Sequence, residues 1–123
     1  MILVDASVWI DHLRRRQSDL TKLLLDGDVL CHPFVIGELA CGHLKQRSRV
    51  LEELARLPQS PVASHDEAMA FAERHALAGR GVGWVDVHLL ASAVLGRTRL
   101  WTRDKRLASV AGTRGLGFNP ATP

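Results

Sequence analysis

Four acidic residues stand where a parallel α/β fold would bring them to one edge of its sheet. Asp5 directly follows the apolar run 2–4, and Asp104 closes the stretch that begins at 99. Asp86 lies in the first turn of an expected helix, and Glu38 lies in the segment FVIGELACG, which holds no other charged residue. Because ligands bind parallel sheets beyond the carboxyl ends of the strands, these four carboxylates are the candidates for chemistry.

Carboxylates gathered at one place repel each other unless a positive charge meets them, and a divalent cation is the simplest such charge. Oxygen ligands without histidine or cysteine select Mg²⁺ or Mn²⁺ rather than zinc. Such an ion suits the hydrolysis of a phosphodiester, because it polarises a phosphoryl oxygen and activates water. Asp5 is the first choice as a direct ligand.

Three of the four acids, taken singly, also have an explanation that involves no chemistry. Asp5 and Asp104 are placed to cap helices, and Asp86 would favour the dipole of its helix from the first turn. Glu38 has no such explanation, since it is expected in mid-helix among apolar residues, where an isolated carboxylate is costly to desolvate. The four acids together therefore favour a functional site.

The placement of these acids depends on short strands and helices that the apolar pattern and the Gly and Pro residues predict. Strands are expected at 2–4, 29–31 and 99–102, with weaker candidates at 62–63 and 116–118. Helices are expected at 7–16, 19–25, from 33 onward, at 45–57, from Ser64 to 79, at 84–95 and at 105–111. Ser64 and Glu67 have the spacing of a capping box, which marks the start of one helix.

Strands that are apolar throughout and separated by helices predict a parallel sheet that is buried on both faces. The expected class is α/β, a three-layer α/β/α sandwich with a central parallel sheet of about four to five strands. A length of 123 residues suits one domain. We expect this domain to span 1–118, followed by a tail at 119–123.

Composition and charge narrow the function classes. The excess of 16 Lys+Arg over 13 Asp+Glu gives a net charge of +3, which is compatible with a polyanionic partner. Cys31 and Cys41 lack the spacing of a disulfide framework or a zinc site, which fits reduced thiols. The opening segment lacks the positive region of a signal peptide, and no apolar stretch reaches the roughly 20 residues of a membrane helix. We therefore expect a cytoplasmic protein with no membrane partner.

Basic side chains flank Asp104, as contact with a phosphate backbone requires. Arg103, Lys105 and Arg106 are the candidates for that contact. The other basic clusters of the chain are explained equally well by solvated helix faces.

Three tryptophans and two histidines have open roles. Trp9 and Trp101 lie in apolar patterns and are expected in the core, whereas Trp84, at a loop–helix junction, is open to stacking on an unpaired base. His32 and His88 are weaker candidates for contact with a substrate.

The acids fall in four sequence blocks, namely ILVDASVWIDHLR, FVIGELACG, VDVHLLASA and LWTRDKRL. In this order the blocks resemble those of PIN-domain ribonucleases, specifically the VapC-type toxins of bacterial toxin–antitoxin pairs. The resemblance runs from residue 2 to about residue 117. It implies an Mg²⁺- or Mn²⁺-dependent endoribonuclease whose metal-binding and catalytic residues are Asp5, Glu38, Asp86 and Asp104. It also implies RNA as substrate, a cognate antitoxin that silences the active-site groove, and a homodimer.

The same resemblance implies that Ser7 and Thr102 support the metal ligands by hydrogen bonds. The first block of the family usually has Asp-Thr-Ser, whereas Ala6 stands here in place of the threonine. This difference removes one hydroxyl and leaves Ser7 to form the local hydrogen bonds.

Two other functions remain open from the residues. A phosphatase or phosphoacceptor domain would use Asp5 as a nucleophile, but such a site usually has a second Asp where this chain has Ser7. A module that binds RNA or a partner protein without cutting is the second alternative. Clustered negative charge argues against it, because it gains nothing in binding a polyanion.

Overall fold

The computed structural model of the chain describes residues 1–15 and 18–121. The elements within these ranges are, in chain order, β1 (Ile2–Val4), α1 (Ala6–Arg15), α2 (Ser18–Leu25), β2 (Val29–Leu30), α3 (Pro33–Ala40), α4 (Arg47–Arg56), α5 (His65–Arg74), α6 (Trp84–Gly96), β3 (Arg99–Trp101) and α7 (Lys105–Thr113). The helix expected at 7–16 corresponds to α1, and its last expected residue, 16, lies outside the described residues.

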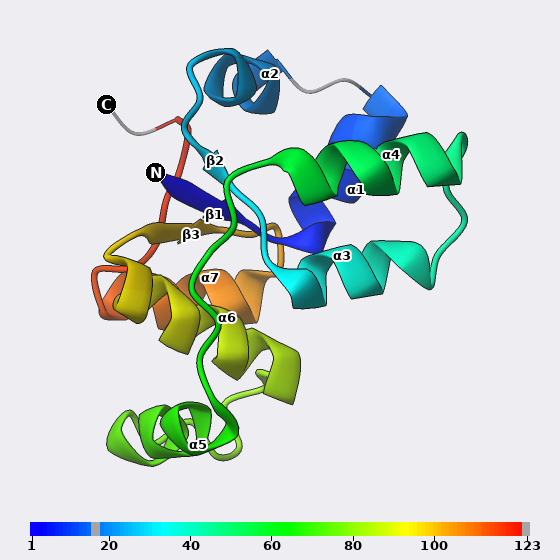
Figure 1. Cartoon of the computed structure of the whole chain (residues 1–123). Helices are drawn as coiled ribbons and strands as arrows, with labels where there is room; N and C mark the ends of the chain where they lie inside the picture. Colours follow the sequence, from blue (N-terminus) through cyan, green and yellow to red (C-terminus); the bar gives the residue numbers. More distant parts are fainter. Residues whose placement is uncertain (16–17, 122–123) are drawn as a thin grey trace.

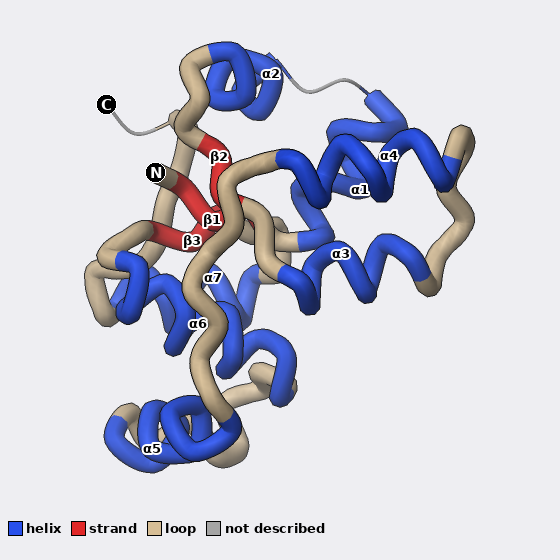
Figure 2. The backbone as a smooth tube through the Cα atoms, in the orientation of Figure 1, coloured by secondary structure: helices blue, strands red, loops and turns tan. Residues whose placement is uncertain are grey.

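The strands form one parallel sheet in the order β2-β1-β3, so the first strand of the chain is central. Leu3 lies opposite Leu30 on one side and Leu100 on the other. Such strands are apolar throughout because both faces of a parallel sheet are covered. Figure 2 shows the short strands surrounded by helices and loops. The predicted α/β class with a parallel sheet is confirmed.

Single bridges extend this sheet at both edges. Cys31 pairs with Gln59 beyond β2, and Leu100 pairs with Gly117 beyond β3, both in parallel. In the described residues the sheet has three strands, and each of these bridges adds a single residue at one edge. The expected four to five strands are therefore reached only if the bridges are counted as strands.

The weak strand predicted at 62–63 is wrong. Ala63 instead donates its N–H to the Ser92 Oγ on α6, at 3.1 Å. The residue that joins the sheet lies earlier, at Gln59, so Ala63 is buried against a helix and Val62 is exposed, and neither lies in a strand.

Helices cover the sheet on two sides. Figure 1 shows α1, α3 and α4 grouped on one side and α5, α6 and α7 on the other, which is the three-layer arrangement that the sequence predicts. In the described ranges, no helix is long and apolar enough to cross a membrane.

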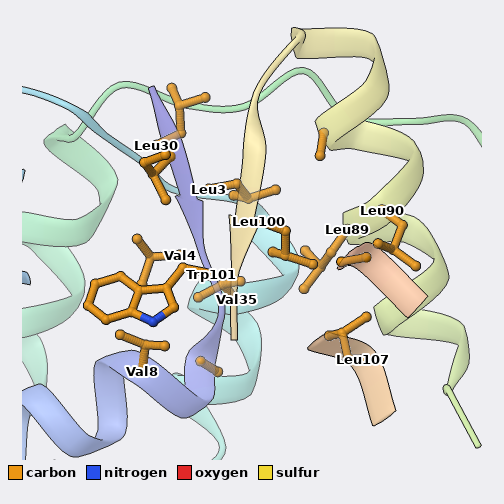
Figure 3. Packing of buried hydrophobic residues seen from close by; sticks show 14 of the residues in the cluster. Leu3, Val4, Val8, Leu30, Val35, Leu89, Leu90, Leu100, Trp101 and Leu107 are labelled. Carbon is orange, nitrogen blue, oxygen red and sulfur yellow. The ribbon is translucent and has the colours of Figure 1, made fainter. Parts of the chain in front are cut away.

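The core fills the space between the sheet and its helices. Figure 3 shows Leu3 and Leu100 from the strands beside Leu89 of α6, and all three side chains are fully buried. Burial of such a side chain contributes about 1.5–3 kcal/mol. Trp9 and Trp101 are 4% and 3% exposed, so their predicted place in the core is confirmed.

Two helices are shorter than expected because the backbone turns left-handed beside them. The capping box at Ser64 is formed, but α5 ends at Arg74, well before residue 79, and Ala76 follows with φ at 49°. The helix expected at 45–57 begins only at Arg47, after Gln46 with φ at 53°. Neither left-handed position is a glycine, the residue type that would have indicated such a turn in the sequence.

His32 links α3 to α6 from inside the core. The ring is fully buried, and its Nδ1 accepts a hydrogen bond from the Phe34 N–H at 3.0 Å, which caps α3. Since Nδ1 accepts, the neutral ring carries its proton on Nε2 and donates it to Ser92 Oγ at 3.1 Å. Burial, with a smaller contribution from the charge of His88, lowers the pKa of His32 from 6.5 to about 4.

The stability of the protein should therefore depend on His32 in mildly acidic solution. The unfolded chain takes up a proton below pH 6.5 while the folded ring stays neutral to about pH 4, so the free energy of unfolding falls as pH drops through this window. The expected loss is about 2–3 kcal/mol. In His32→Asn the amide oxygen can still cap α3 but does not titrate, so urea unfolding at pH 7 and near pH 4 should show that much less loss than in the parent. His43→Asn, at an exposed histidine, is the control, and equal pH dependence in the parent and His32→Asn would contradict the assignment.

Candidate active site

Asp5 is the buried centre of the acidic edge, with 7% of the residue exposed. It follows β1 directly, and its N–H donates to the Trp101 carbonyl of β3 at 2.9 Å. Its Oδ1 accepts from the Ala6 N–H at 2.8 Å. Its Oδ2 accepts from two hydroxyls, Ser7 Oγ at 2.8 Å and Thr102 Oγ1 at 2.7 Å. A carboxylate has about four lone-pair positions, so one remains available, on Oδ1.

The two hydroxyls join the ends of β1 and β3. Ser7 Oγ and Thr102 Oγ1 are 3.3 Å apart. Each also accepts a backbone N–H from the loop after β3, from Arg103 to Ser7 at 3.0 Å and from Asp104 to Thr102 at 3.1 Å. Ala6 contributes only its N–H to this network, so Ser7 forms the local hydroxyl contact that the sequence predicts for it.

Asp104 is the N-cap of α7, so the capping role that the sequence suggests for it is present in the structure. Its Oδ1 accepts from the N–H groups of Arg106 at 2.9 Å and Leu107 at 3.0 Å. Among the described residues no hydrogen bond involves Oδ2. Capping therefore occupies one oxygen of this exposed side chain and leaves the other free to bind a cation.

Asp86 lies in the first turn of α6 and is half-buried. Its Oδ2 accepts from the Gly83 N–H at 2.9 Å, which fixes the start of the helix. Burial raises the pKa of Asp86, the Gly83 hydrogen bond lowers it, and the negative charges of Asp5 and Asp104 raise it again.

Glu38 lies on α3, across the site from α6. Burial raises the pKa of this carboxyl, and the negative charges of Asp5 and Asp86 raise it further. In the part of the chain that the structure describes, no hydrogen bond or ion pair involves its side chain. The residue as a whole is exposed, so its carboxylate is accessible to a ligand.

The charges that raise these two pKa values come from neighbouring acids, Asp5 and Asp86 for Glu38, and Asp5 and Asp104 for Asp86. The salt bridges among the described residues are Arg49–Glu53 and Arg103–Asp11, so neither neutralises the four acids. Within the same residues, no three His, Cys, Asp or Glu side chains are close enough to hold a metal ion jointly. The carboxylates thus share one region without forming a closed cage. A hydrated Mg²⁺ fits this donor set, because it binds through one or two carboxylates and keeps several waters.

The basic candidates differ in their surroundings. Arg103 Nε is 2.7 Å from Asp11 Oδ2, so this guanidinium is already paired. Arg106 lies against the glycine loop, residues 79–83 between α5 and α6, since a Cβ at Gly81 would lie 2.5 Å from Arg106 Cδ. Lys105 is exposed at the first turn of α7.

Two features of this region escaped the sequence analysis. Asp11, one helical turn after Ser7 on α1, holds Arg103, and only that i, i+4 spacing could have suggested its closeness to the site. His88 is not free to meet a substrate, since it is 5% exposed and packs between the rings of Phe34 and Trp84. His32 is likewise enclosed, as the cap of α3.

The sequence and the fold can now be compared with known proteins. A family model described as PIN domain matches residues 2–113. The chain is 53% identical over 119 residues to proteins named Ribonuclease VapC32 from two strains of Mycobacterium tuberculosis, with 96% of each chain covered.

Among solved structures, the fold is similar to FitAcB from Neisseria gonorrhoeae, with a TM-score of 0.64, 20% identity and 100% of both chains covered. It is also similar to PAE2754 from Pyrobaculum aerophilum, with a TM-score of 0.58, 19% identity, and 89% of this chain and 78% of that chain covered. The match of the family model over most of the chain and the high identity to the mycobacterial relatives lead to one conclusion. This chain belongs to the PIN-domain family and is a VapC-type member of it.

Proposed function

We propose that this protein is a metal-dependent endoribonuclease that hydrolyses RNA phosphodiester bonds as the toxin of a toxin–antitoxin pair. The observation that carries the proposal is the joint placement of Asp5 and Asp104 after β1 and β3, linked through Thr102. Asp86 and Glu38 are the further carboxylates of this region, and neither of the described salt bridges neutralises any of the four. The relatives named Ribonuclease VapC32 support the same activity. Clustered negative charge is unfavourable for folding, so its presence favours a function that uses it.

Mg²⁺ or Mn²⁺ is the proposed cofactor. One or two of the four acids would bind it directly, with Asp5 through Oδ1 and Asp104 through Oδ2 as the available oxygens, and Asp86 and Glu38 would take part directly or through its bound waters. The ion would supply a Lewis acid that polarises a phosphoryl oxygen and activates water for attack. The chain contributes orientation, because two hydroxyls fix the Asp5 carboxylate from one side.

Basic side chains on α7 would hold the RNA strand. Lys105 and Arg106 directly follow Asp104 at the start of this helix and are exposed. Arg103 would join them only after leaving Asp11, so we assign it a smaller share of the phosphate contacts.

A nucleophilic role for Asp5 is disfavoured. Its two oxygens accept three hydrogen bonds, from Ala6, Ser7 and Thr102, and the residue is buried. Hydrogen bonds to a carboxylate lower its nucleophilicity, whereas they orient a metal ligand. A module that binds RNA without cutting it is also disfavoured. The clustered acids repel RNA unless a cation binds between them.

The proposal also covers the binding partners of the protein and its location in the cell. A toxin of this kind acts on RNA in the cytoplasm, forms a homodimer and is silenced by a small antitoxin. These are expectations that follow from the function, and each has its own measurement.

Loss of the Asp5 carboxylate should abolish cleavage. Asp5→Asn is expected to lower the rate of RNA cleavage by purified protein more than about 100-fold, since it removes a metal ligand. Thr102→Val, which removes one supporting hydroxyl, should lower it about 10- to 100-fold. Asp26→Asn, at an exposed turn, is the control. Sequencing of RNA 5′ ends after induced expression measures the same loss in cells, and an Asp5→Asn protein that cuts at the parental rate would contradict the assignment.

Metal ions should stabilise the folded protein through the acidic site. At a Mg²⁺ or Mn²⁺ concentration about 100 times Kd, the free energy of unfolding should rise by roughly 2.7 kcal/mol. Glu38→Gln removes one repelling charge, so without metal it should be at least as stable as the parent, and it should gain less from the ion. Glu52→Gln, at an exposed acid on α4, should gain as much as the parent. Thermal unfolding with and without metal provides the measurement, and an undiminished gain in Glu38→Gln would count against that ligand.

The antitoxin should be encoded beside this chain. A short reading frame immediately upstream is expected, and its product should co-purify with the protein and suppress RNA cleavage. The control is co-expression with the same frame interrupted by a stop codon. Cleavage that continues undiminished in the presence of the intact product would refute the pairing.

A further inference from the structure

Trp84 is a large apolar side chain held at the surface beside the acidic site. It is 41% exposed, whereas Trp9 and Trp101 are buried. It is the first residue of α6, two positions before Asp86. An exposed aromatic ring next to a candidate metal ligand is placed where it can contact a bound substrate.

The indole is fixed by rings that lead back into the core. The Trp84 ring packs edge-on against His88, with centroids 4.6 Å apart, and lies tilted against His65, with centroids 5.2 Å apart. His88 packs in turn on Phe34 of α3 at 4.8 Å, and Phe34 lies one helical turn before Glu38. A rigid aromatic ring loses little conformational entropy when it binds a partner.

A hollow of about 600 Å³ adjoins the indole, between α5, α6 and the glycine loop. Its walls are mostly apolar, with Met69, Leu77 and Val82 beside Trp84, and they include one acid, Glu73. Gly83 also lines it, and the Gly83 N–H donates to Asp86, so the hollow borders the acidic site.

A positive charge stands at the rim of this hollow. Gly81, next to Val82 of the wall, is covered by the Arg106 side chain. An apolar wall with an aromatic ring, next to a guanidinium and a carboxylate site, matches the chemistry of a nucleotide, whose base is flat and apolar and whose phosphate is anionic.

We infer that Trp84 and the hollow beside it bind an unpaired base of the RNA substrate, next to the phosphate that is cut, with Arg106 at a neighbouring phosphate. This inference rests on the proposed ribonuclease function and adds the site that selects single-stranded substrate. The base stacks on the indole, which the histidines hold in place.

The test measures binding and not cutting. In the Asp5→Asn background with Mg²⁺, fluorescence titration gives the Kd of a short oligoadenylate and of an abasic strand of equal length. Trp84→Ala should weaken oligoadenylate binding roughly 5- to 150-fold and leave the abasic strand unchanged. Trp84→Phe should restore most of the affinity. Leu95→Ala, at a similarly exposed residue near the other end of α6, is the matched control and should change neither affinity.

Three results would overturn the inference. These are an unchanged affinity in Trp84→Ala, an equal loss for both strands, and a fall in the molar mass of Trp84→Ala by light scattering, which would make the hollow a contact between copies of the chain. Because the readout is independent of cleavage, the two proposals fail separately. A parent that cuts no RNA refutes the nuclease alone, and a parent that cuts RNA with a neutral Trp84→Ala refutes the base site alone.

Discussion

Thr102 donates a hydrogen bond to Asp5, which lies 97 positions earlier in the chain. The acidic site depends on this contact. The parallel pairing of β1 with β3 makes it possible, because Val4 lies opposite Trp101 and both strands end at the same edge. The same hydroxyl receives the N–H of Asp104, so one threonine orients two of the four acids. Misplacement of β3 by one residue would turn Trp101 to the opposite face of the sheet and Thr102 away from Asp5.

Electrostatics at this edge opposes stability. Burial and mutual repulsion raise the pKa of both Glu38 and Asp86, which means that the folded protein holds these carboxylates under unfavourable conditions. The apolar core under the site offsets this cost, with Leu3 and Leu100 fully buried directly behind the strand ends. Functional sites commonly retain such unfavourable charges, since removal of the charges stabilises the fold but ends the chemistry.

Local patterns predicted the parts of this structure that local energetics controls. The apolar runs became β1 and β3, the capping box at Ser64 began α5, and the acids after the strands met at one edge. The four acids were proposed as a site because each lies in or directly after an apolar segment of the sequence, and their role as a site stays a prediction.

Other features depend on contacts that a sequence pattern does not contain. The role of His32 as a buried cap requires Ser92, 60 positions away, and the pairing of Arg103 with Asp11 requires that α1 and the loop after β3 come together. The early end of α5 depends on a left-handed turn at Ala76, a residue type that seldom adopts it. The spacing of the carboxylates likewise follows from tertiary packing and has no signature in the chain.

The narrow sheet has a consequence for assembly. Each of its edges is finished by one residue, Gln59 on one side and Gly117 on the other, and β2 is only two residues long. An edge that short offers no row of free N–H and C=O groups along which a foreign strand could align. A second protein must therefore recognise this molecule through its helices and loops, and the sheet itself is protected from the edge-to-edge growth that leads to fibrils.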